Sequence, residues 1–365
     1  MKKFLLLSVA ATLICSLSFA TIRRVGYAGT SLSGVDFPNF SNAENASSAG
    51  DTIQIYGNNS HGAVTKQLVI IGFGYNFDVH PGLQAIGTDR PSEITLTFGP
   101  GSDGSIATGL SGNFTIGDPY NTHITVANIT FFRCYGRFDF LNTIANGLCS
   151  NIKILSSVIE RLTSGSQYGY SSNDYPVNNL QVFNCIAGAI YLDKSTTTAS
   201  FINCVSSPSI YQGSGLSLNN ATVLVKNSIL SSASSTQNIN TVYENNFFQQ
   251  AQPVVLPPGS NNRWGQDWSV LFNRITNAND DASSYNSGAV FDENYYVLKA
   301  GSPAINGGFN SANAATNCGI FGGEPLYVYK PSGVPSVPAI YKLTAPSLTA
   351  GTNPYNVTIS VKSNN

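Results

Sequence analysis

Apolar and polar residues alternate along most of the chain in many short segments. Residues 178–207 contain one pattern twice: apolar residues at every second position lead to an Asn-Cys pair at 184–185 and again at 203–204. A period of two places alternate residues on one face of a β-strand. The recurrence of the whole pattern predicts neighbouring strands that repeat one another.

The pattern continues on both sides of this segment. Equivalent polar positions fall at 156, 184, 203, 227 and 245, and position 133 has Arg in place of the amide. Because the spacing varies while the pattern persists, it favours a solenoid with loops of different lengths, in which like residues stack. We expect Asn184, Asn203, Asn227 and Asn245 to form a ladder in which each buried amide bonds to the next.

The remaining chain also favours β-structure. Period-two segments bounded by turn residues predict strands at 52–56, 67–72, 93–98, 105–110, 114–116 and 124–126. Residues 36–49 instead predict an amphipathic helix, with Asp36 as N-cap, that covers the first edge of the stack. Residues 73–91 are expected to leave the stack, and 267–272 to form a turn or two of helix. The Pro-rich end predicts an extended segment along the stack followed by one terminal strand, or alternatively a small appended module.

The start of the chain has the features of a signal peptide. Lys2 and Lys3 precede an apolar run, and Ser18-Phe19-Ala20 supplies a small-x-small cleavage site. A lipid anchor at Cys15 is disfavoured by the bulky Ile14. We therefore expect a signal peptide at 1–20 and a secreted or cell-surface protein. The expected divisions are an N-terminal strand and capping helix at 21–50, a parallel β-helix at 51–323 and an extended tail at 324–365.

Composition excludes several classes of protein. Charged residues make up only 10% of the chain and the net charge is −1, so nothing favours nucleic acid or an anionic membrane as partner. No stretch after the signal peptide is long and apolar enough to span a membrane. The cysteines and the three histidines lack metal-site spacing, so we expect no metal and no cofactor. Cys185 and Cys204 are expected to pack as thiols, since parallel Cβ vectors fit a disulfide poorly.

Several longer segments carry a family resemblance. They are AGDTIQIYG (49–57), KQLVIIGFGYNFD (66–78), SEITLTFGPGSDGSIATGL (92–110), LKAGSPAINGG (298–308), NCGIFGG (317–323) and NVTISVKS (356–363). With them the chain resembles exported bacterial, Bacteroidetes-type β-helix repeat proteins of the pectin-lyase-like superfamily, which have no established activity. The resemblance implies an all-β fold, a single-stranded right-handed parallel β-helix, and covers nearly all of the chain after residue 20. It implies little about chemistry, because this superfamily contains enzymes, adhesins and scaffolds.

The enzyme signatures of that superfamily are not matched. Asp280-Asp281 is the only Asp pair, and Ser60-His61-Gly62 does not match the Gly-His-Gly of polygalacturonase-like hydrolases. Phe138-Asp139-Phe140 is only superficially similar to the methylesterase segment, and the Arg-x-Pro-x-x-Arg setting of pectate-lyase-like chains is missing. No catalytic residue is therefore carried over.

Charge is concentrated in one part of this charge-poor chain. Arg and carboxylate side chains are followed by a tyrosine-rich loop, in a set that could bind a sugar in a groove. The candidate residues are Arg133, Arg137, Asp139, Glu160, Arg161, Tyr168, Tyr170, Asp174 and Tyr175. The alternative is a set of salt bridges across strands with packed tyrosines.

Two further features have a structural and a functional interpretation. Trp264 and Trp268 could stack on a sugar ring, but Trp268 is expected to help close the C-terminal end of the stack. Asp280 and Asp281 could bind calcium, but a polar loop is expected.

Taken together, the sequence predicts an exported, surface-associated, non-enzymatic scaffold that binds a carbohydrate or another surface ligand. The alternative is a polysaccharide lyase or glycoside hydrolase acting on an acidic glycan in a groove between Arg133 and Tyr175. A pure spacer without a ligand is a third hypothesis. The sequence leaves the oligomeric state open.

Overall fold

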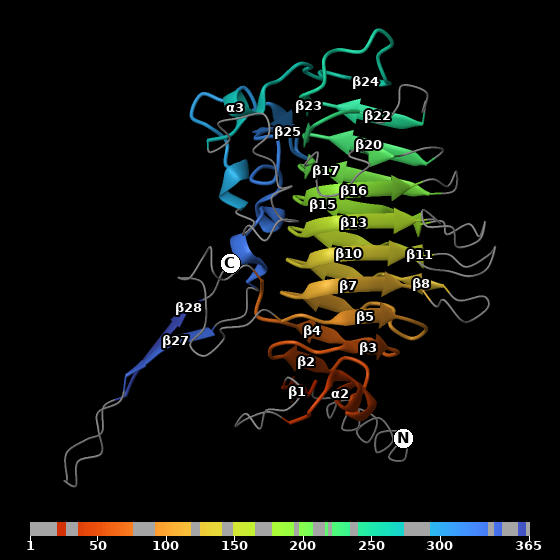
Figure 1. The fold of residues 1–365 in the computed structure, drawn as a ribbon, viewed down its shortest axis with the longest axis vertical. Helices are drawn as coiled ribbons and strands as arrows, with labels where there is room; N and C mark the ends of the chain where they lie inside the picture. The colour runs from red at the N-terminus through yellow and green to blue at the C-terminus, as the bar shows by residue number, and fades with distance from the viewer. Residues whose placement is uncertain are drawn as a thin grey trace, which may run out of the picture.

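A computed structural model of the protein describes residues 20–26, 36–75, 92–117, 125–140, 149–164, 177–192, 197–206, 216–217, 221–233, 240–273, 293–334, 339–344 and 357–362. These residues form a tall stack of parallel strands, with the N-terminal end of the chain at one end of the stack and the C-terminal segment along its side (Figure 1). The signal peptide expected at 1–20 lies outside the described residues except for Ala20.

Two long parallel sheets run along the stack, and a third, three-stranded parallel sheet covers only part of it. The first has the order β1 (Ile22–Val25), β2 (Thr52–Ile55), β4 (Val69–Ile71), β6 (Ile106–Thr108), β9 (Thr130–Phe132), β12 (Lys153–Leu155), β15 (Leu180–Phe183), β17 (Thr198–Ile202), β20 (Thr222–Lys226), β22 (Thr241–Glu244) and β24 (Gly259–Ser260). The second has the order β3 (His61–Val64), β5 (Thr95–Phe98), β7 (Ser111–Ile116), β10 (Tyr135–Phe140), β13 (Val158–Ser164), β16 (Ile186–Leu192), β18 (Val205–Ser206), β21 (Ile229–Leu230) and β23 (Phe247–Phe248), with β19 (Leu216–Ser217) beside β16. The third consists of β8 (Val126–Ala127), β11 (Cys149–Ser150) and β14 (Val177–Asn178).

Consecutive strands of the chain contribute to different sheets. In one coil β11, β12 and β13 follow one another, and each pairs in parallel with its equivalent in the coils before and after. This arrangement confirms the predicted parallel β-solenoid. Of the predicted strands, those near 52–56, 67–72, 93–98, 105–110 and 114–116 are present, while β3 had not been predicted.

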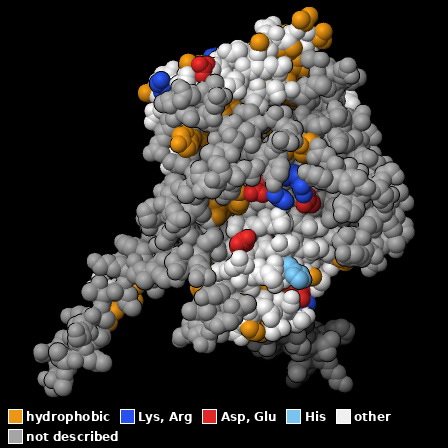
Figure 2. Space-filling view, viewed as in Figure 1, with side chains coloured by type: hydrophobic (Ala, Val, Ile, Leu, Met, Phe, Trp, Pro, Cys, Tyr) orange, Lys and Arg blue, Asp and Glu red, His pale blue; other side chains and the backbone are white. Residues whose placement is uncertain are grey.

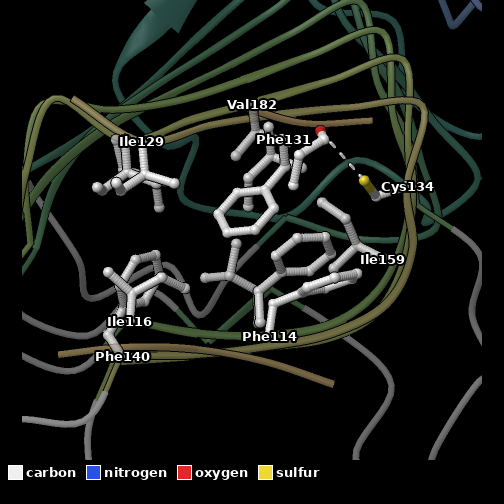
Figure 3. Packing of buried hydrophobic residues seen from close by; sticks show 14 of the residues in the cluster. Phe114, Ile116, Ile129, Phe131, Cys134, Phe140, Ile159 and Val182 are labelled. Atoms are coloured by element: carbon white, nitrogen blue, oxygen red, sulfur yellow. Dashed lines mark hydrogen bonds between the residues drawn. The ribbon is translucent and has the colours of Figure 1, made fainter. Parts of the chain in front are cut away.

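The register places like residues over like in the interior. One column of the first sheet contains Phe131, Ile154, Val182, Phe201, Val225 and Tyr243, all buried. Figure 3 shows Phe131 of this sheet facing Phe114 of the second sheet, with Ile159 beside them and Phe140 next to Ile116 farther across the core. The Phe114 ring lies 5.2 Å from Phe131 and 5.0 Å from Phe138, measured between centroids. Burial of these columns is the main stabilising contribution, at about 25 cal/mol per Å² of apolar surface.

The repeated polar positions lie at the corner between the first and second sheets. Positions 133, 156, 184, 203, 227 and 245 all have left-handed backbone conformation, with φ between 49° and 56°. Asn adopts this conformation at lower cost than other residues with a Cβ, because its short amide can bond locally. Each repeat of the pattern therefore marks a bend that ends one strand and redirects the chain into the next sheet.

The predicted amide ladder at this corner is wrong in its bonding. The Asn184 amide donates to the carbonyls of Ile320 and Gly322 at 2.8 and 2.7 Å, and the Asn203 amide donates to Asn317 and Gly319. The Asn227 amide both donates to and accepts from the backbone of Phe309. In each case the partner comes from residues 309–334, here named the C-terminal strap. The left-handed bend turns these side chains away from their own stack and toward the strap.

The strap runs along the corner in reverse order. Its residues meet corner positions 227, 203, 184, 156 and 133 in that sequence, ending with Ser156 Oγ donating to Tyr327 O at 2.5 Å and Arg133 Nη1 donating to Val334 O at 2.7 Å. Short 3-10 helices interrupt it at η4 (Pro325–Tyr327) and η5 (Pro331–Gly333). The antiparallel pair β25 (Gly308–Phe309) and β26 (Ala315–Thr316) lies at its start.

A buried polar cluster fastens the far end of the strap. The hydroxyls of Tyr75 and Tyr329 lie 3.1 Å apart, and Tyr329 donates to the fully buried Glu293 carboxylate at 3.2 Å. The same carboxylate accepts from the backbone of Ser332 at 2.8 Å. Burial raises the pKa of both tyrosines well above their usual value. The cluster joins three distant parts of the chain: the segment at Tyr75, the short helix η3 (Glu293–Tyr296), which begins with Glu293, and the strap.

An amide ladder does exist, but at another corner. Asn151 Nδ2 donates to Asn128 Oδ1 at 3.1 Å, and Asn179 Nδ2 donates to Asn151 Oδ1 at 2.9 Å. These three residues also have positive φ and lie on the surface beside the third sheet. Here the side chains are exposed, and each amide bonds to its neighbour along the stack.

The predicted N-terminal helix is shorter than expected. Helix α2 (Phe40–Ala46) begins after Asn39, whose side chain accepts from the Asn42 N–H, whereas Asp36 accepts from the backbone of Arg24 in β1. The bridge between Phe37 and Val25 keeps this stretch extended. Phe40 is fully buried, and a Cβ at Gly62 of β3 would lie only 2.1 Å from its ring.

The C-terminal end is an antiparallel pair, not the single terminal strand predicted. β27 (Ala339–Thr344) pairs with β28 (Thr358–Lys362), because two alternating segments, rather than one, are available there. Helix α3 (Trp268–Leu271) lies within the predicted 267–272 with Asp267 as its N-cap. Trp268 is buried against Phe272 and Tyr296.

The cysteines that the structure describes are buried thiols. Cys134, Cys149, Cys185, Cys204 and Cys318 form no disulfide. Cys185 and Cys204 occupy equivalent places in adjacent coils, and each Sγ donates to backbone carbonyls. This confirms the prediction that they pack as thiols.

Candidate functional site

A polar groove crosses the outer face of the second sheet. It has a volume of about 340 Å³ and follows the starts of five successive strands, β3, β5, β7, β10 and β13. Because adjacent strands lie 4.7–4.9 Å apart, five of them span about 20 Å along the stack. Its lining consists of Asn58, Asn59, Ser60, Glu93, Ile94, Thr95, Ser111, Gly112, Asn113, Tyr135, Gly136, Arg137 and Glu160. Figure 2 shows charged side chains of both signs gathered at mid-height on this face.

The register explains why polar side chains converge in the groove. Thr95, Asn113 and Arg137 occupy one outward-facing column, since Asn113 pairs with Arg137 and Leu96 with Phe114. The next position inward contains Gly112 and Gly136 in adjacent strands, both with φ near 140°. A Cβ at Gly136 would lie 1.7 Å from the carbonyl oxygen of Gly112. Gly112 and Gly136 therefore contribute only backbone to the lining, and their conformation lets neighbouring coils approach closely.

One wall of the groove is an ion pair with an aromatic partner. Arg137 Nε donates to Glu160 Oε2 at 3.1 Å, and the Tyr135 hydroxyl donates to Glu160 Oε1. All three side chains are half-buried. The Tyr135 ring also packs on the ring of Tyr75 at 5.4 Å. Such contacts hold the side chains of the wall in fixed orientations.

A β-bulge creates this arrangement. Gly136 pairs with Ile159 but Arg137 pairs with Arg161, so Glu160 is an extra residue in β13. Glu160 and Arg161 are consequently two consecutive half-exposed residues in a strand whose neighbours Ile159 and Leu162 are buried. Bulges re-aim side chains in this way and are common near functional sites. In an unbroken register Arg137 would pair with Glu160, and Arg161 would pair with the buried Phe138 and face the interior; the bulge leaves both Glu160 and Arg161 on the outer face.

A second ion pair lies farther along the same two strands. Arg161 Nη2 donates to both carboxylate oxygens of Asp139 at 3.0 and 3.1 Å, and Thr163 donates to Asp139 at 2.6 Å. This pair does not line the groove. The salt-bridge interpretation of the charged residues therefore describes Asp139 and Arg161, while Arg137 and Glu160 are paired and also face the groove.

Arg133 is not part of this face. It lies at the corner with only 3% of its surface exposed, bonded to the strap, and its guanidinium lies 4.6 Å from the centroid of the Phe132 ring. Burial lowers its pKa to about 10. Arg133 thus donates a hydrogen bond to a backbone carbonyl of the strap, as the corner asparagines do. The loop candidates Tyr168, Tyr170, Asp174 and Tyr175, and the pair Asp280-Asp281, lie outside the described residues.

Most of the groove lining was not predicted from the sequence. The residues not recognised there include Glu93, Asn58, Asn113 and Tyr135. In the structure the Glu93 carboxylate accepts a hydrogen bond from the Asn58 amide at 3.0 Å. The available signal was the alternation in 111–116 and 135–140, which turns Asn113 and Arg137 outward together. Trp264 stacks on Phe248 with ring centroids 4.1 Å apart, and is thereby occupied by a protein ring.

No group of three or more His, Cys, Asp or Glu side chains placed to hold a metal occurs among the described residues. No helix in the described part of the chain is long and apolar enough to cross a membrane. No known protein family, curated protein or solved structure matches the chain.

Proposed function

We propose that the protein is an exported, surface-associated β-helix scaffold that binds a carbohydrate in the groove of the second sheet. The observation that carries the proposal is the groove itself, with polar side chains from five successive coils around the backbone of Gly112 and Gly136. Amide, hydroxyl, carboxylate and guanidinium groups together donate and accept hydrogen bonds, as saccharide hydroxyls require. Export rests on the signal peptide expected at 1–20.

The proposed solenoid is right-handed, with α2 as its N-terminal cap. Nearly all crossovers between parallel strands of one sheet are right-handed, because strand twist favours that hand. The burial of Phe40 and Ala43 in the same core as the first strands supports a capping role for the helix. The pectin-lyase-like resemblance supports the same handedness.

A glycan array probed with the protein from Thr21 onward tests the proposed binding. Arg137→Gln should weaken binding of a saccharide found on the array by about tenfold, or about 1.4 kcal/mol, because Arg137 lines the groove and orients Glu160. The matched control is Lys226→Gln, which removes one positive charge from the outer face of the first sheet. Equal weakening by both variants, or the absence of any bound glycan, contradicts the proposal.

The groove supports the alternative function, glycoside hydrolysis, less well. Its two carboxylates, Glu93 and Glu160, lie three strand spacings apart, about 14 Å along the stack, whereas most glycosidases act through two carboxyl groups about 5 to 9.5 Å apart. The test is the release of reducing ends from a glycan that binds. A bound glycan that stays intact over prolonged incubation excludes this function.

A further inference from the structure

The charges of the groove are arranged so that no positive group among its described lining is left for an anionic ligand. Arg137, the only cation in that lining, is paired with Glu160 at 3.1 Å. The next guanidinium along the sheet, Arg161, contacts both oxygens of Asp139. Both of these arginines are thus already matched by a carboxylate of the protein.

The lining also carries one carboxylate in excess. Glu93 lies at the opposite end of the groove from the ion pair and is exposed, and its carboxylate accepts a hydrogen bond from the neutral Asn58 amide. With two carboxylates and one guanidinium, the described lining has a net charge of −1. A carboxylate of a ligand would meet like charge at Glu93, and would have to displace Glu160 to reach Arg137.

We infer that the groove selects uncharged saccharides and discriminates against uronates. This inference rests on the proposed function and names the chemical class of its ligand. The inference also differs from the acidic glycan expected from the arginines in the sequence. In the structure those arginines form ion pairs within the protein, Arg137 with Glu160 and Arg161 with Asp139. The neutral donors and acceptors of the groove, which include Asn58, Asn113 and Thr95, match hydroxyl groups.

The test compares two series of oligosaccharides with the same backbone. One series carries uronate carboxylates, and in the other these carboxylates are reduced to hydroxymethyl groups. Isothermal titration at low ionic strength should show at least about tenfold tighter binding of the neutral series, with the difference shrinking as salt is added. Glu93→Gln should strengthen uronate binding about threefold relative to neutral binding, as expected for one partly screened charge. Glu244→Gln on the first sheet is the control and should change neither.

The outcomes separate the two ideas. Equal or tighter binding of the uronate series overturns the charge selection and leaves carbohydrate binding intact. Failure of Glu93→Gln to change the uronate affinity relative to the neutral affinity also overturns it. Binding of neither series, together with a blank array, overturns the proposed function and this inference with it.

Discussion

The side-chain amide of Asn184 donates a hydrogen bond to the backbone carbonyl of Ile320 at 2.8 Å, across 136 residues of sequence. The same amide reaches Gly322, and both contacts are buried. A corner residue of one coil thereby holds the strap that passes over it. Because Asn203 and Asn227 do the same in the following coils, the strap is bound by a row of amides rather than by a single anchor.

Asn184→Ala should destabilise the protein by about 3 kcal/mol. Two buried hydrogen bonds are lost at about 1 kcal/mol each, and Ala pays about 1 kcal/mol more in the left-handed conformation. Denaturant unfolding provides the measurement. The matched control is Asn261→Ala, an exposed left-handed position that should lose only about 1 kcal/mol. Similar losses in the two variants would show that the strap contacts add nothing.

Gly333→Ala should loosen the end of the strap. Gly333 has φ +58°, and a Cβ there would lie 2.2 Å from the Tyr75 ring and 2.8 Å from the Arg133 carbonyl oxygen. We expect a loss of about 3 kcal/mol, from backbone strain and overpacking together, and faster hydrogen exchange in the peptide 324–334.

The control for that variant is Gly301→Ala. Gly301 also has positive φ, +80°, but nothing lies within 4 Å of its ideal Cβ. It should lose about 1 kcal/mol from strain alone, without faster exchange at 324–334. Unchanged exchange in Gly333→Ala would mean that the strap does not depend on the close approach to Tyr75.

The solenoid could be predicted because its signal is local. Alternation and a repeated phrase specify strands and their stacking without knowledge of distant contacts. The corner was misinterpreted because Asn184 continues the alternation of Leu180 and Val182, so the sequence gives no sign that its φ is positive. Its bonding partner lies in the strap, whose path no local pattern specifies.

The groove could be predicted only in part for a related reason. Glu160 and Arg161 break the alternation of β13 as two consecutive polar residues, which is a visible sign of a bulge. Which cation each carboxylate meets depends on register across strands 23 residues apart, as with Arg137 and Glu160. The burial of Arg133 depends on the strap, and thus on tertiary structure alone.

The buried thiols should be unreactive in the folded protein. Burial raises the pKa of Cys134, Cys149, Cys204 and Cys318 to about 12, so almost no thiolate, the reactive form, exists at pH 8. A thiol reagent should modify none of the described cysteines in native protein produced from Thr21 onward, and all five after unfolding without reductant. Fewer than five would reveal a disulfide.

The same pKa shifts predict how stability depends on pH. The unfolded thiols release protons near pH 8.5, whereas the folded thiols keep theirs up to about pH 12. The folded state therefore binds more protons between these values, and the free energy of unfolding falls as pH rises through that window, by up to about 1.4 kcal/mol per pH unit for each thiol. Below pH 8 this contribution is fully present. Cys204→Ala should reduce the slope by about one thiol's share, and an unchanged slope would contradict the assignment.

Deleting Glu160 should preserve the fold and remove one wall of the groove in which we propose that a saccharide binds. Without the extra residue, Ile159, Arg161 and Leu162 alternate regularly, so β13 can pair with β10 without a bulge, and the irregularity moves to the next coil, where Gly188 of β16 becomes the extra residue. Arg137 then loses its carboxylate and faces Arg161, at an expected cost of about 1–2 kcal/mol from lost and repulsive cross-strand pairs. The deletion variant should keep the circular dichroism spectrum and cooperative unfolding of the parent protein.

Binding distinguishes the bulge from a merely structural irregularity. The deletion should weaken saccharide binding at least as much as Arg137→Gln, because both the carboxylate and the orientation of Arg137 are lost from the groove. Glu160→Gln is the control for geometry, since it keeps the bulge and the residue count but removes the charge. If the deletion variant folds and binds as the parent does, the groove between β10 and β13 is not the binding site. If it fails to fold, Glu160→Gln decides the same question through its effect on binding.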